Sequence, residues 1–277
     1  MDDPKALTRA TYNLTADQFD DAPLAPWAAV GRRTIELVGL AHGNRVLDVC
    51  CGTGSTALPA AEAVGRFGTV LGVDLAEGLL AVAARKAARR GLVNVEFRAA
   101  DFERMAFPSS SCDAVVCQFG VFFLTDMTTA VRRMWSLVAP GGALAITTWG
   151  PRIFEPARGL FQEALAQVRP DLVAESTSCE QVSTDAGLRN LFSAAGANPP
   201  EVHAEVLTQV MERPEDFWPS MTGSGTRRTI EAMGPEAATR VREAVLQGIV
   251  RDEVTTLQSD VLYAVARKAA PDPVAGG

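Results

Sequence analysis

Short apolar runs alternate with longer amphipathic stretches through the first half of the chain. Five runs rich in valine, leucine and alanine lie at residues 46–49, 69–74, 95–99, 114–118 and 143–149. Runs of this length and composition are typical of strands buried on both faces, and the stretches between them place apolar residues at helical spacing. Strands that alternate with helices predict right-handed crossovers and a doubly wound, mostly parallel α/β sheet.

The segments on either side of this region have their own patterns. Residues 4–41 predict two N-terminal helices, and residues 157–168 and 184–195 predict two more helices beyond the core. Residues 201–211 and 254–268 alternate between apolar and polar positions, so we expect them to form an antiparallel pair at the sheet edge. The sheet should then have seven strands, with the last strand antiparallel.

Composition limits the class of protein. The chain has 277 residues and a formal net charge of −7, which argues against nucleic-acid binding. No stretch reaches the ~18 consecutive apolar residues of a membrane span, and the N-terminus lacks the features of a signal peptide, so we expect a cytoplasmic protein. The five cysteines form no CxxC pair and histidine occurs only twice, so we expect free thiols and no metal site.

The first strand leads into a glycine-rich turn that is followed by a helix. The segment from Gly52 to Ala57 reads GTGSTA, which matches the dinucleotide-binding fingerprint in its alanine form. Asp74 lies 20 residues beyond Gly54, at the end of the second strand, where a carboxylate can accept hydrogen bonds from a ribose diol. Because several nucleotides carry this diol, the motif predicts a nucleotide ligand without identifying it.

Three further features favour a ligand with a cationic end over a nicotinamide dinucleotide. Asp48 lies within the first strand, where its carboxylate would repel a pyrophosphate. Asp101 and Phe102 follow the third strand and offer an acceptor for an adenine amino group and a ring for its face. Neither Tyr12 nor Tyr263 is followed by a lysine four residues later, so the tyrosine–lysine pair of a reductase site is missing.

Taken in order, these motifs resemble those of the class I S-adenosylmethionine-dependent methyltransferases. The motifs are residues 46–54, Asp74, Asp101 with Phe102, residues 107–113 and residues 137–142. They are most similar to the branch that contains the ubiquinone/menaquinone-biosynthesis C-methyltransferases, and the resemblance covers about residues 40–150. Cys50 departs from the pattern, because family members usually have glycine at this position. The resemblance implies S-adenosylmethionine as cofactor and S-adenosylhomocysteine as product.

The resemblance also implies which residues contact the methionine part of the cofactor. Asp48 is expected near the methionine amino group, directly or through water or backbone, and Gln118 is expected near the same part. Gly52 and Gly54 allow the cofactor to pass close to the turn. Cys50 and Thr53, in the same turn, complete this part of the implied cofactor-binding set.

The adenosine part of the cofactor is assigned to the ends of the second and third strands by the same resemblance. Asp74 would hold the ribose hydroxyls, and Leu75 would flank the adenine. Asp101 would bind the adenine amino group, and Phe102 would pack on the ring.

Aromatic residues make up only 6% of the chain, so their positions carry information. Eight of them lie in the N-terminal helices, after the fourth and fifth strands, or near residue 217: Tyr12, Phe19, Trp27, Phe122, Phe123, Trp149, Phe217 and Trp218. Because open α/β sheets bind ligands at the carboxyl ends of their strands, we expect these side chains to enclose an apolar or aromatic small-molecule acceptor. No general base stands out. His203 is expected on the surface, Asp126 is expected to cap a helix, and Glu155 is a weak candidate.

Together these patterns predict one compact catalytic domain in four parts. Residues 1–150 hold the N-terminal helices and a Rossmann-like cofactor-binding core, and residues 151–211 hold a helical cap segment and a sheet-edge strand. Residues 212–253 are expected to form a helical lid. Residues 254–277 are expected to form the final strand and a disordered tail.

The expected function is methyl transfer from S-adenosylmethionine to the acceptor by in-line displacement. Two alternatives stay open: a protein that binds the cofactor without methyl transfer, and an NAD(P)-dependent oxidoreductase. The sequence identifies neither the acceptor nor the methylated atom, and it leaves a homodimer open.

Overall fold

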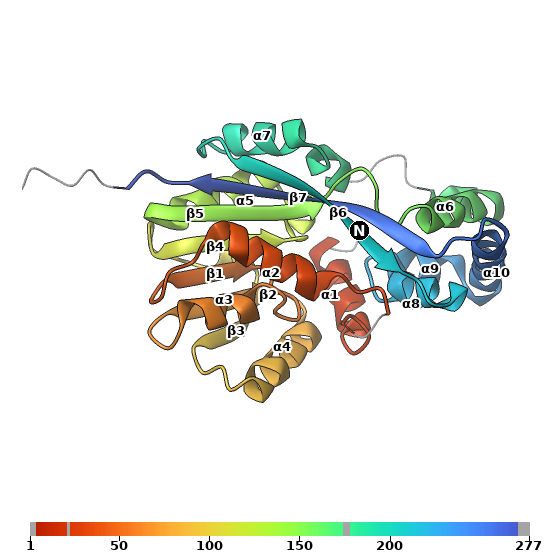
Figure 1. Ribbon diagram of the computed structural model, residues 1–277, viewed down its shortest axis with the longest axis horizontal. Helices are drawn as coiled ribbons and strands as arrows, with labels where there is room; N and C mark the ends of the chain where they lie inside the picture. Colours follow the sequence, from red (N-terminus) through yellow and green to blue (C-terminus); the bar gives the residue numbers. More distant parts are fainter. Residues whose placement is uncertain (1–3, 21–22, 174–177, 271–277) are drawn as a thin grey trace, which may run out of the picture.

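A seven-stranded sheet in the order β3-β2-β1-β4-β5-β7-β6 forms the centre of the computed structural model, which describes residues 4–20, 23–173 and 178–270 (Figure 1). The strands are β1 (Arg45–Val49), β2 (Thr69–Asp74), β3 (Val95–Ala99), β4 (Cys112–Gln118), β5 (Val138–Trp149), β6 (Glu201–Val210) and β7 (Thr256–Arg267). Strands β1 to β5 are parallel, and β7 is antiparallel to both β5 and β6. The expected sheet and its antiparallel edge pair are therefore confirmed. The expected disordered tail, residues 271–277, lies outside the described residues.

Helices cover both faces of this sheet. They are α1 (Pro4–Thr15), α2 (Trp27–Val38), α3 (Ala57–Val64), α4 (Glu77–Arg89), α5 (Met127–Leu137), α6 (Ala157–Val168), α7 (Asp185–Ala194), α8 (Phe217–Thr222), α9 (Arg227–Met233) and α10 (Pro235–Arg251). Short 3₁₀ turns are η1 (Phe102–Arg104), η2 (Val121–Phe123), η3 (Pro170–Leu172), η4 (Ser178–Val182) and η5 (Pro214–Asp216).

The alternation of side chains along β4 shows why helices are needed on both faces. Val115 and Cys117 point into a core closed by α5 and α7, whereas Ala114 and Val116 point into a core closed by α2 and α3. Successive side chains of a strand point to opposite faces, so a central strand with apolar residues at every position must be covered on both sides. The two helical layers lie above and below the sheet in Figure 1.

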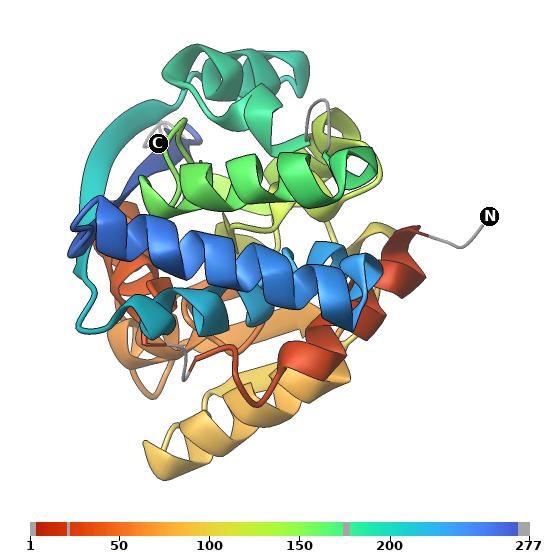
Figure 2. The ribbon, with the colours of Figure 1, turned by 90° about the vertical axis from the view of Figure 1, so that its right-hand side faces the viewer.

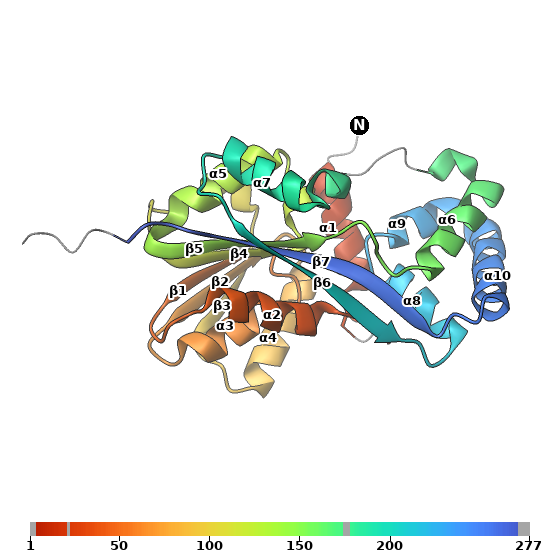
Figure 3. The same cartoon turned by 45° about the horizontal axis from the view of Figure 1, so that its top comes forward.

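A third apolar core lies beyond the carboxyl ends of the parallel strands. It joins α6, α8, α9 and α10 to the ends of β5 and β7, with Phe161, Phe217 and Val245 among its fully or nearly fully buried side chains. Figure 2 shows α10 lying across this end of the molecule between α6 and α8, and Figure 3 shows the same group of helices beyond the sheet. This group, which includes the segment expected as a lid, encloses the end of the sheet where ligands bind in open α/β folds.

The structure differs from the expected elements at the start of β5. This strand begins at Val138 rather than residue 143, and its pairing with β4 shifts register between Cys112 and Ala114. The shift accommodates Gly141, whose φ is +82° and whose N–H donates to the backbone of Lys268 and Ala269. The segment Pro140-Gly141-Gly142 is thus an irregularity inside a longer strand, because glycine supplies the conformation that a bulge requires. No helix within the described ranges has the length and hydropathy needed to cross a membrane.

Gly31 in α2 permits a close approach between this helix and the glycine turn. A Cβ added at Gly31 would lie 1.9 Å from the Ser55 carbonyl oxygen, so the helix would have to move. We expect Gly31→Ala to lower the free energy of unfolding by about 2 kcal/mol or more, measured by urea denaturation. Gly159→Ala in α6 is the matched control, because its Cβ would meet only the flexible Glu155 side chain at 3.2 Å. Equal stability of the two variants would contradict the close approach.

Candidate functional site

A cavity of about 590 Å³ lies at the carboxyl ends of the parallel strands. One side of its wall follows β1, β2 and β3, and the other side follows β4 and β5 and continues onto α6 and α9; α1 lies along it. Fourteen of the eighteen residues assigned to the site from the sequence line this one cavity: Tyr12, Phe19, Trp27, Cys50, Gly52, Thr53, Asp74, Leu75, Asp101, Phe102, Gln118, Phe122, Phe123 and Trp149. Segments distant in sequence are therefore brought together at one place.

The turn after β1 has an unusual backbone. Cys50, Gly52 and Gly54 have φ angles of +58°, +52° and +80°. Glycine adopts these angles at little cost, whereas a residue with a side chain rarely does, which explains why glycine is usual at the position of Cys50. Gly120 accommodates the departure, because a Cβ at Gly120 would lie 2.4 Å from the Cβ of Cys50. Gly54 does not line the cavity but shapes the turn, since a Cβ there would lie 3.1 Å from Leu58 Cγ.

Asp48 is fully buried and does not form part of the cavity wall. Its Oδ2 accepts a hydrogen bond of 2.6 Å from the Thr56 hydroxyl, and its Oδ1 has no hydrogen-bond partner among the described residues. Burial raises the pKa of Asp48 to about 7, against the opposing hydrogen bond from Thr56. Thr56 is the N-cap residue of α3. Its hydroxyl makes no capping hydrogen bond and donates to Asp48 instead.

The carboxylate of Asp74 is fixed by the backbone on both sides. Its Oδ2 accepts from the Gly52 N–H at 2.9 Å, and its Oδ1 accepts from the Ala76 N–H at 2.9 Å. Burial raises the pKa of Asp74, and these two N–H groups oppose the rise. Each oxygen keeps a further lone pair, so the carboxylate can still accept hydrogen bonds from a ligand in the cavity.

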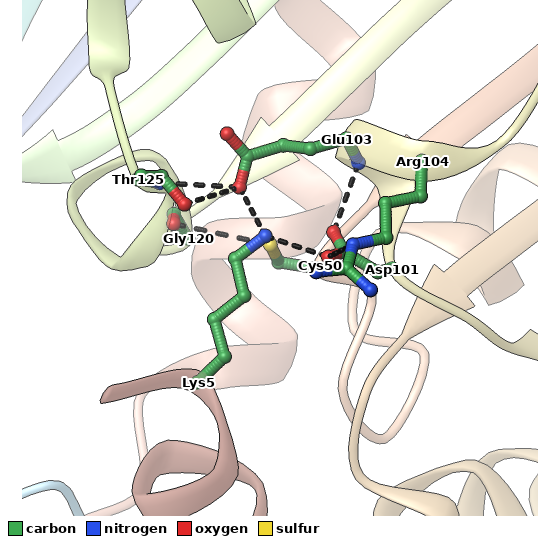
Figure 4. A network of polar contacts seen from close by, with 7 residues as sticks. All are labelled: Lys5, Cys50, Asp101, Glu103, Arg104, Gly120 and Thr125. Atoms are coloured by element: carbon green, nitrogen blue, oxygen red, sulfur yellow. Dashed lines mark hydrogen bonds and ion pairs between the residues drawn. The ribbon is translucent and has the colours of Figure 1, made fainter. Parts of the chain in front are cut away.

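A small ionic network closes the cavity at the end of β3 (Figure 4). Lys5 of α1 extends its Nζ to within 2.7 Å of Asp101 Oδ2 and 2.5 Å of Glu103 Oε2. Glu103 also accepts from the backbone N–H and the hydroxyl of Thr125. Burial alone would lower the pKa of Lys5, but the hydrogen bonds from its Nζ to Asp101 and Glu103 raise it. No pattern in the sequence points to Lys5, because a single lysine in a surface helix is usually solvated.

Stacked aromatic rings form the opposite wall, with Trp27 at the centre. Trp27 stacks on Phe19 at 4.8 Å between centroids and meets Phe119 and Trp149 edge-on at 5.7 Å and 6.0 Å. Phe119 and Trp149 stack at 4.0 Å, and Tyr12 meets Phe19 edge-on at 5.9 Å. Phe119 was missed by the sequence analysis, although its place directly after β4 is the signal that identified Phe122.

Two residues expected at the acceptor site lie elsewhere. Phe217 is completely buried in the core that joins the terminal helices to the sheet, and Trp218 packs with Phe161 at 6.2 Å between centroids. The expectation that they line the cavity is corrected, because α8 turns these two rings toward its neighbouring helices. Met221 of the same helix does reach the cavity.

None of the residues considered as a general base lines the cavity. His203 lies 3.2 Å from Glu201 on the edge strand, and Asp126 accepts the Thr129 N–H at 2.6 Å as the cap of α5, as expected for both. The third candidate, Glu155, accepts the Gly159 N–H at 3.1 Å. The part of the chain that the structure describes also contains no group of ligands that could hold a metal ion.

Comparisons with known proteins identify the class to which this site belongs. Residues 46–142 match the family model described as "Methyltransferase domain". The nocamycin O-methyltransferase of Saccharothrix syringae is 33% identical over 212 residues, which are 74% of each chain. The chain therefore belongs to the class I S-adenosylmethionine-dependent methyltransferases.

Two further relatives match over shorter lengths. Aklanonic acid methyltransferase DauC of Streptomyces sp. strain C5 is 35% identical over 144 residues, which are 52% of this chain and 65% of that protein. The ubiquinone/menaquinone biosynthesis C-methyltransferase UbiE of Pseudomonas entomophila is 37% identical over 138 residues, 50% of this chain and 53% of UbiE. The match thus spans about half the length of UbiE.

Solved structures share the fold at low sequence identity. A putative methyltransferase from Bacillus halodurans C-125 superposes with a TM-score of 0.58 at 19% identity and covers 87% of this chain and 100% of its own. The [4+2]-cyclase SpnF superposes with a TM-score of 0.60 at 19% identity and covers 96% of this chain and 97% of its own. At this identity the likeness shows the fold alone.

Proposed function

We propose that this methyltransferase transfers its methyl group to an aromatic or otherwise apolar small molecule that binds against the stacked rings. The observation that carries the proposal is the single cavity, which joins the acidic carboxyl ends of β2 and β3 to a wall of aromatic side chains. The nocamycin and aklanonic acid methyltransferases are named for small organic molecules, which supports an acceptor of this size.

The residues of the cavity fit the cofactor of the family. Asp74 would hold the ribose hydroxyls, and Asp101 and Phe102 would receive the adenine. One residue of the cavity wall, Gln118, has a buried acceptor oxygen, Oε1, with no hydrogen-bond partner among the described residues. Unpartnered buried acceptors favour a ligand that brings hydrogen-bond donors or positive charge, as the ammonium end of the cofactor does. Leu75, Gly52, Thr53 and Cys50 would complete the contacts along the turn.

The protein contributes alignment rather than covalent chemistry. When bound, S-adenosylmethionine supplies a methyl group that is already activated by its positively charged sulfur. The acceptor would lie against the rings of Trp149, Phe119 and Trp27, which would align it with that methyl group and exclude water. Alignment of two reactants in a dry site can be worth about 7–11 kcal/mol without any proton transfer.

The experiment that tests the proposal is methyl transfer to a panel of acceptors. Purified protein would be incubated with tritium-labelled S-adenosylmethionine and polycyclic aromatic, phenolic and quinone acceptors, and labelled products would be separated by chromatography. We expect labelled product from at least one apolar aromatic acceptor. Cofactor binding without transfer to any member would contradict methyl transfer and favour another role for the same cavity, and binding of NAD(P)H instead would favour an oxidoreductase.

Substitutions of Trp149 and Phe217 distinguish a loss of acceptor binding from a loss of core packing. Trp149→Ala removes a ring of the cavity wall, so we expect the KM for the acceptor to rise about tenfold or more while S-adenosylhomocysteine binding changes less than twofold. Phe217→Ala removes an equally buried ring outside the cavity, so it should lower the melting temperature and leave the KM within about twofold. Steady-state kinetics and thermal denaturation check both variants. A KM effect from Phe217→Ala alone would contradict the assignment of the wall.

We also propose that the protein works in the cytoplasm and without nucleic acid. The net charge of −7 and the five free cysteines support this proposal. A homodimer stays a prediction that analytical ultracentrifugation would test.

A further inference from the structure

The charged side chains of the cavity wall are divided between its two sides. On the cofactor side, the acids Asp74 and Asp101 face two cations that are already paired. Lys5 bonds Asp101 and Glu103, and Arg9 pairs with Glu77. Both cations on this side therefore have carboxylate partners within the protein, whereas Asp74 is held by backbone N–H groups.

The acceptor side carries two arginines and no acid. Arg158 of α6 is half-buried and Arg228 of α9 is exposed; both line the cavity. The hydrogen bonds and ion pairs of the described chain include none made by either guanidinium group, whereas most other arginines in it pair with a nearby carboxylate. An arginine that stays unpaired inside a cavity lined with aromatic rings is available for an anionic oxygen of a ligand.

The same side of the cavity offers nothing that could remove a proton from an acceptor. Besides the acids and cations already named, the titratable groups of the cavity wall are Tyr12 and Cys179, together with Cys50 of the turn after β1. Burial raises the pKa of Cys179 to about 11, although the charge of Arg158 opposes the rise, and burial raises the pKa of Tyr12 far above its ordinary value. A hydrogen bond with Cys117 and burial raise the pKa of Cys50 as well. All three groups stay protonated at neutral pH and cannot act as general bases.

We propose that the acceptor is an aromatic acid that enters the cavity already ionised, with its anionic oxygen bound by Arg158 and Arg228. This inference rests on the proposed methyl transfer and names its substrate class. The ionised oxygen forms the new bond to the methyl carbon, and the bond between that carbon and sulfur breaks with its electron pair left on sulfur. No proton is released, so the missing base is not needed. The bound anion also supplies the negative partner that neither arginine has among the described residues.

Binding of a matched pair of probes tests the inference without turnover. Naphthalene-2-carboxylate and naphthalene-2-carboxamide share ring and shape and differ in charge, and each would be titrated by calorimetry into protein saturated with S-adenosylhomocysteine. We expect the carboxylate to bind at least about tenfold more tightly than the amide. Arg158→Met should reduce this preference to about twofold or less, and Arg228→Met should reduce it partly. Arg240→Met, an exposed arginine of α10 outside the cavity wall, should leave it unchanged.

Two results would overturn the inference. One is equal affinity of the wild-type protein for both probes, and the other is a full preference for the carboxylate in Arg158→Met. In the transfer assay, turnover of neutral acceptors at rates comparable to acids would also overturn it while leaving the proposed methyl transfer intact. Failure of the proposed function is distinct, because it would appear as absence of transfer to every acceptor, acidic or neutral.

Discussion

Asp74→Asn is expected to weaken the binding of S-adenosylhomocysteine by about 30- to 100-fold, measured by isothermal titration calorimetry. Both carboxylate oxygens of Asp74 accept backbone N–H bonds, from Gly52 and Ala76, and keep lone pairs directed toward the cavity. An asparagine presents an NH₂ group to one of these donors, so the turn loses a hydrogen bond and the ribose loses a charged acceptor. Such losses amount to about 2–3 kcal/mol.

Asp113→Asn is the matched control for this measurement. Asp113 also accepts a backbone N–H, that of Arg45 at 2.7 Å, but at the opposite ends of β1 and β4. We expect it to leave the affinity for S-adenosylhomocysteine unchanged within twofold. An affinity of Asp74→Asn within threefold of the wild-type value would contradict the assignment of Asp74 to the cofactor.

Asp48→Asn is expected to flatten the pH dependence of the free energy of unfolding. Burial raises the pKa of Asp48 to about 7 in the folded protein, against about 3.8 in the unfolded chain. The folded state therefore binds the proton more tightly, so this group's contribution to stability is complete below pH ~4 and is lost as pH rises through ~7. A rise of about three pKa units corresponds to about 4 kcal/mol.

The measurement is the free energy of urea unfolding at pH 5 and at pH 8 for the wild type and the variant without cofactor. Asp48→Asn should gain stability relative to the wild type at pH 8, since the amide carries no charge and can still accept from Thr56. Asp113→Asn should instead cost the same stability at both pH values. Burial alone would raise the pKa of Asp113, but the hydrogen bonds from Arg45 lower it below its ordinary value of 3.8, so its contribution is complete above pH ~4. Parallel pH profiles of the wild type and Asp48→Asn would show that Asp48 is not a buried, mostly protonated acid.

The core of the fold was predictable from sequence because local pattern and tertiary structure agree there. The apolar runs that became β1, β2 and β4 are mostly buried, so composition identifies them. The run expected as a strand buried on both faces at residues 95–99 became β3, whose residues are half-buried or exposed because it lies at the edge of the sheet. Asp74 and Asp101 were predictable for a related reason: an acid that ends a buried parallel strand must lie at the carboxyl edge of the sheet, where the cavity forms.

The remaining residues of the site depend on side-chain directions that sequence does not specify. Phe217 and Met221 lie in one short helix, yet only Met221 reaches the cavity, because the rotation of α8 decides which side chain points inward. Lys5 and Arg158 come from helices at either end of the cavity, and neither stands in a motif. Their importance appears only when the elements around them are placed in space, Lys5 as the partner of Asp101 and Arg158 as a cation that no described acid neutralises.

A crystal structure of the protein with S-adenosylhomocysteine is the most direct test of whether the cofactor binds in this cavity. We expect the ribose hydroxyls within hydrogen-bonding distance of Asp74 and the adenine beside Phe102 and Asp101. The sulfur should face the aromatic wall formed by Trp27, Phe119 and Trp149. Density for the cofactor at another place on the chain, or an empty cavity at saturating ligand, would contradict it.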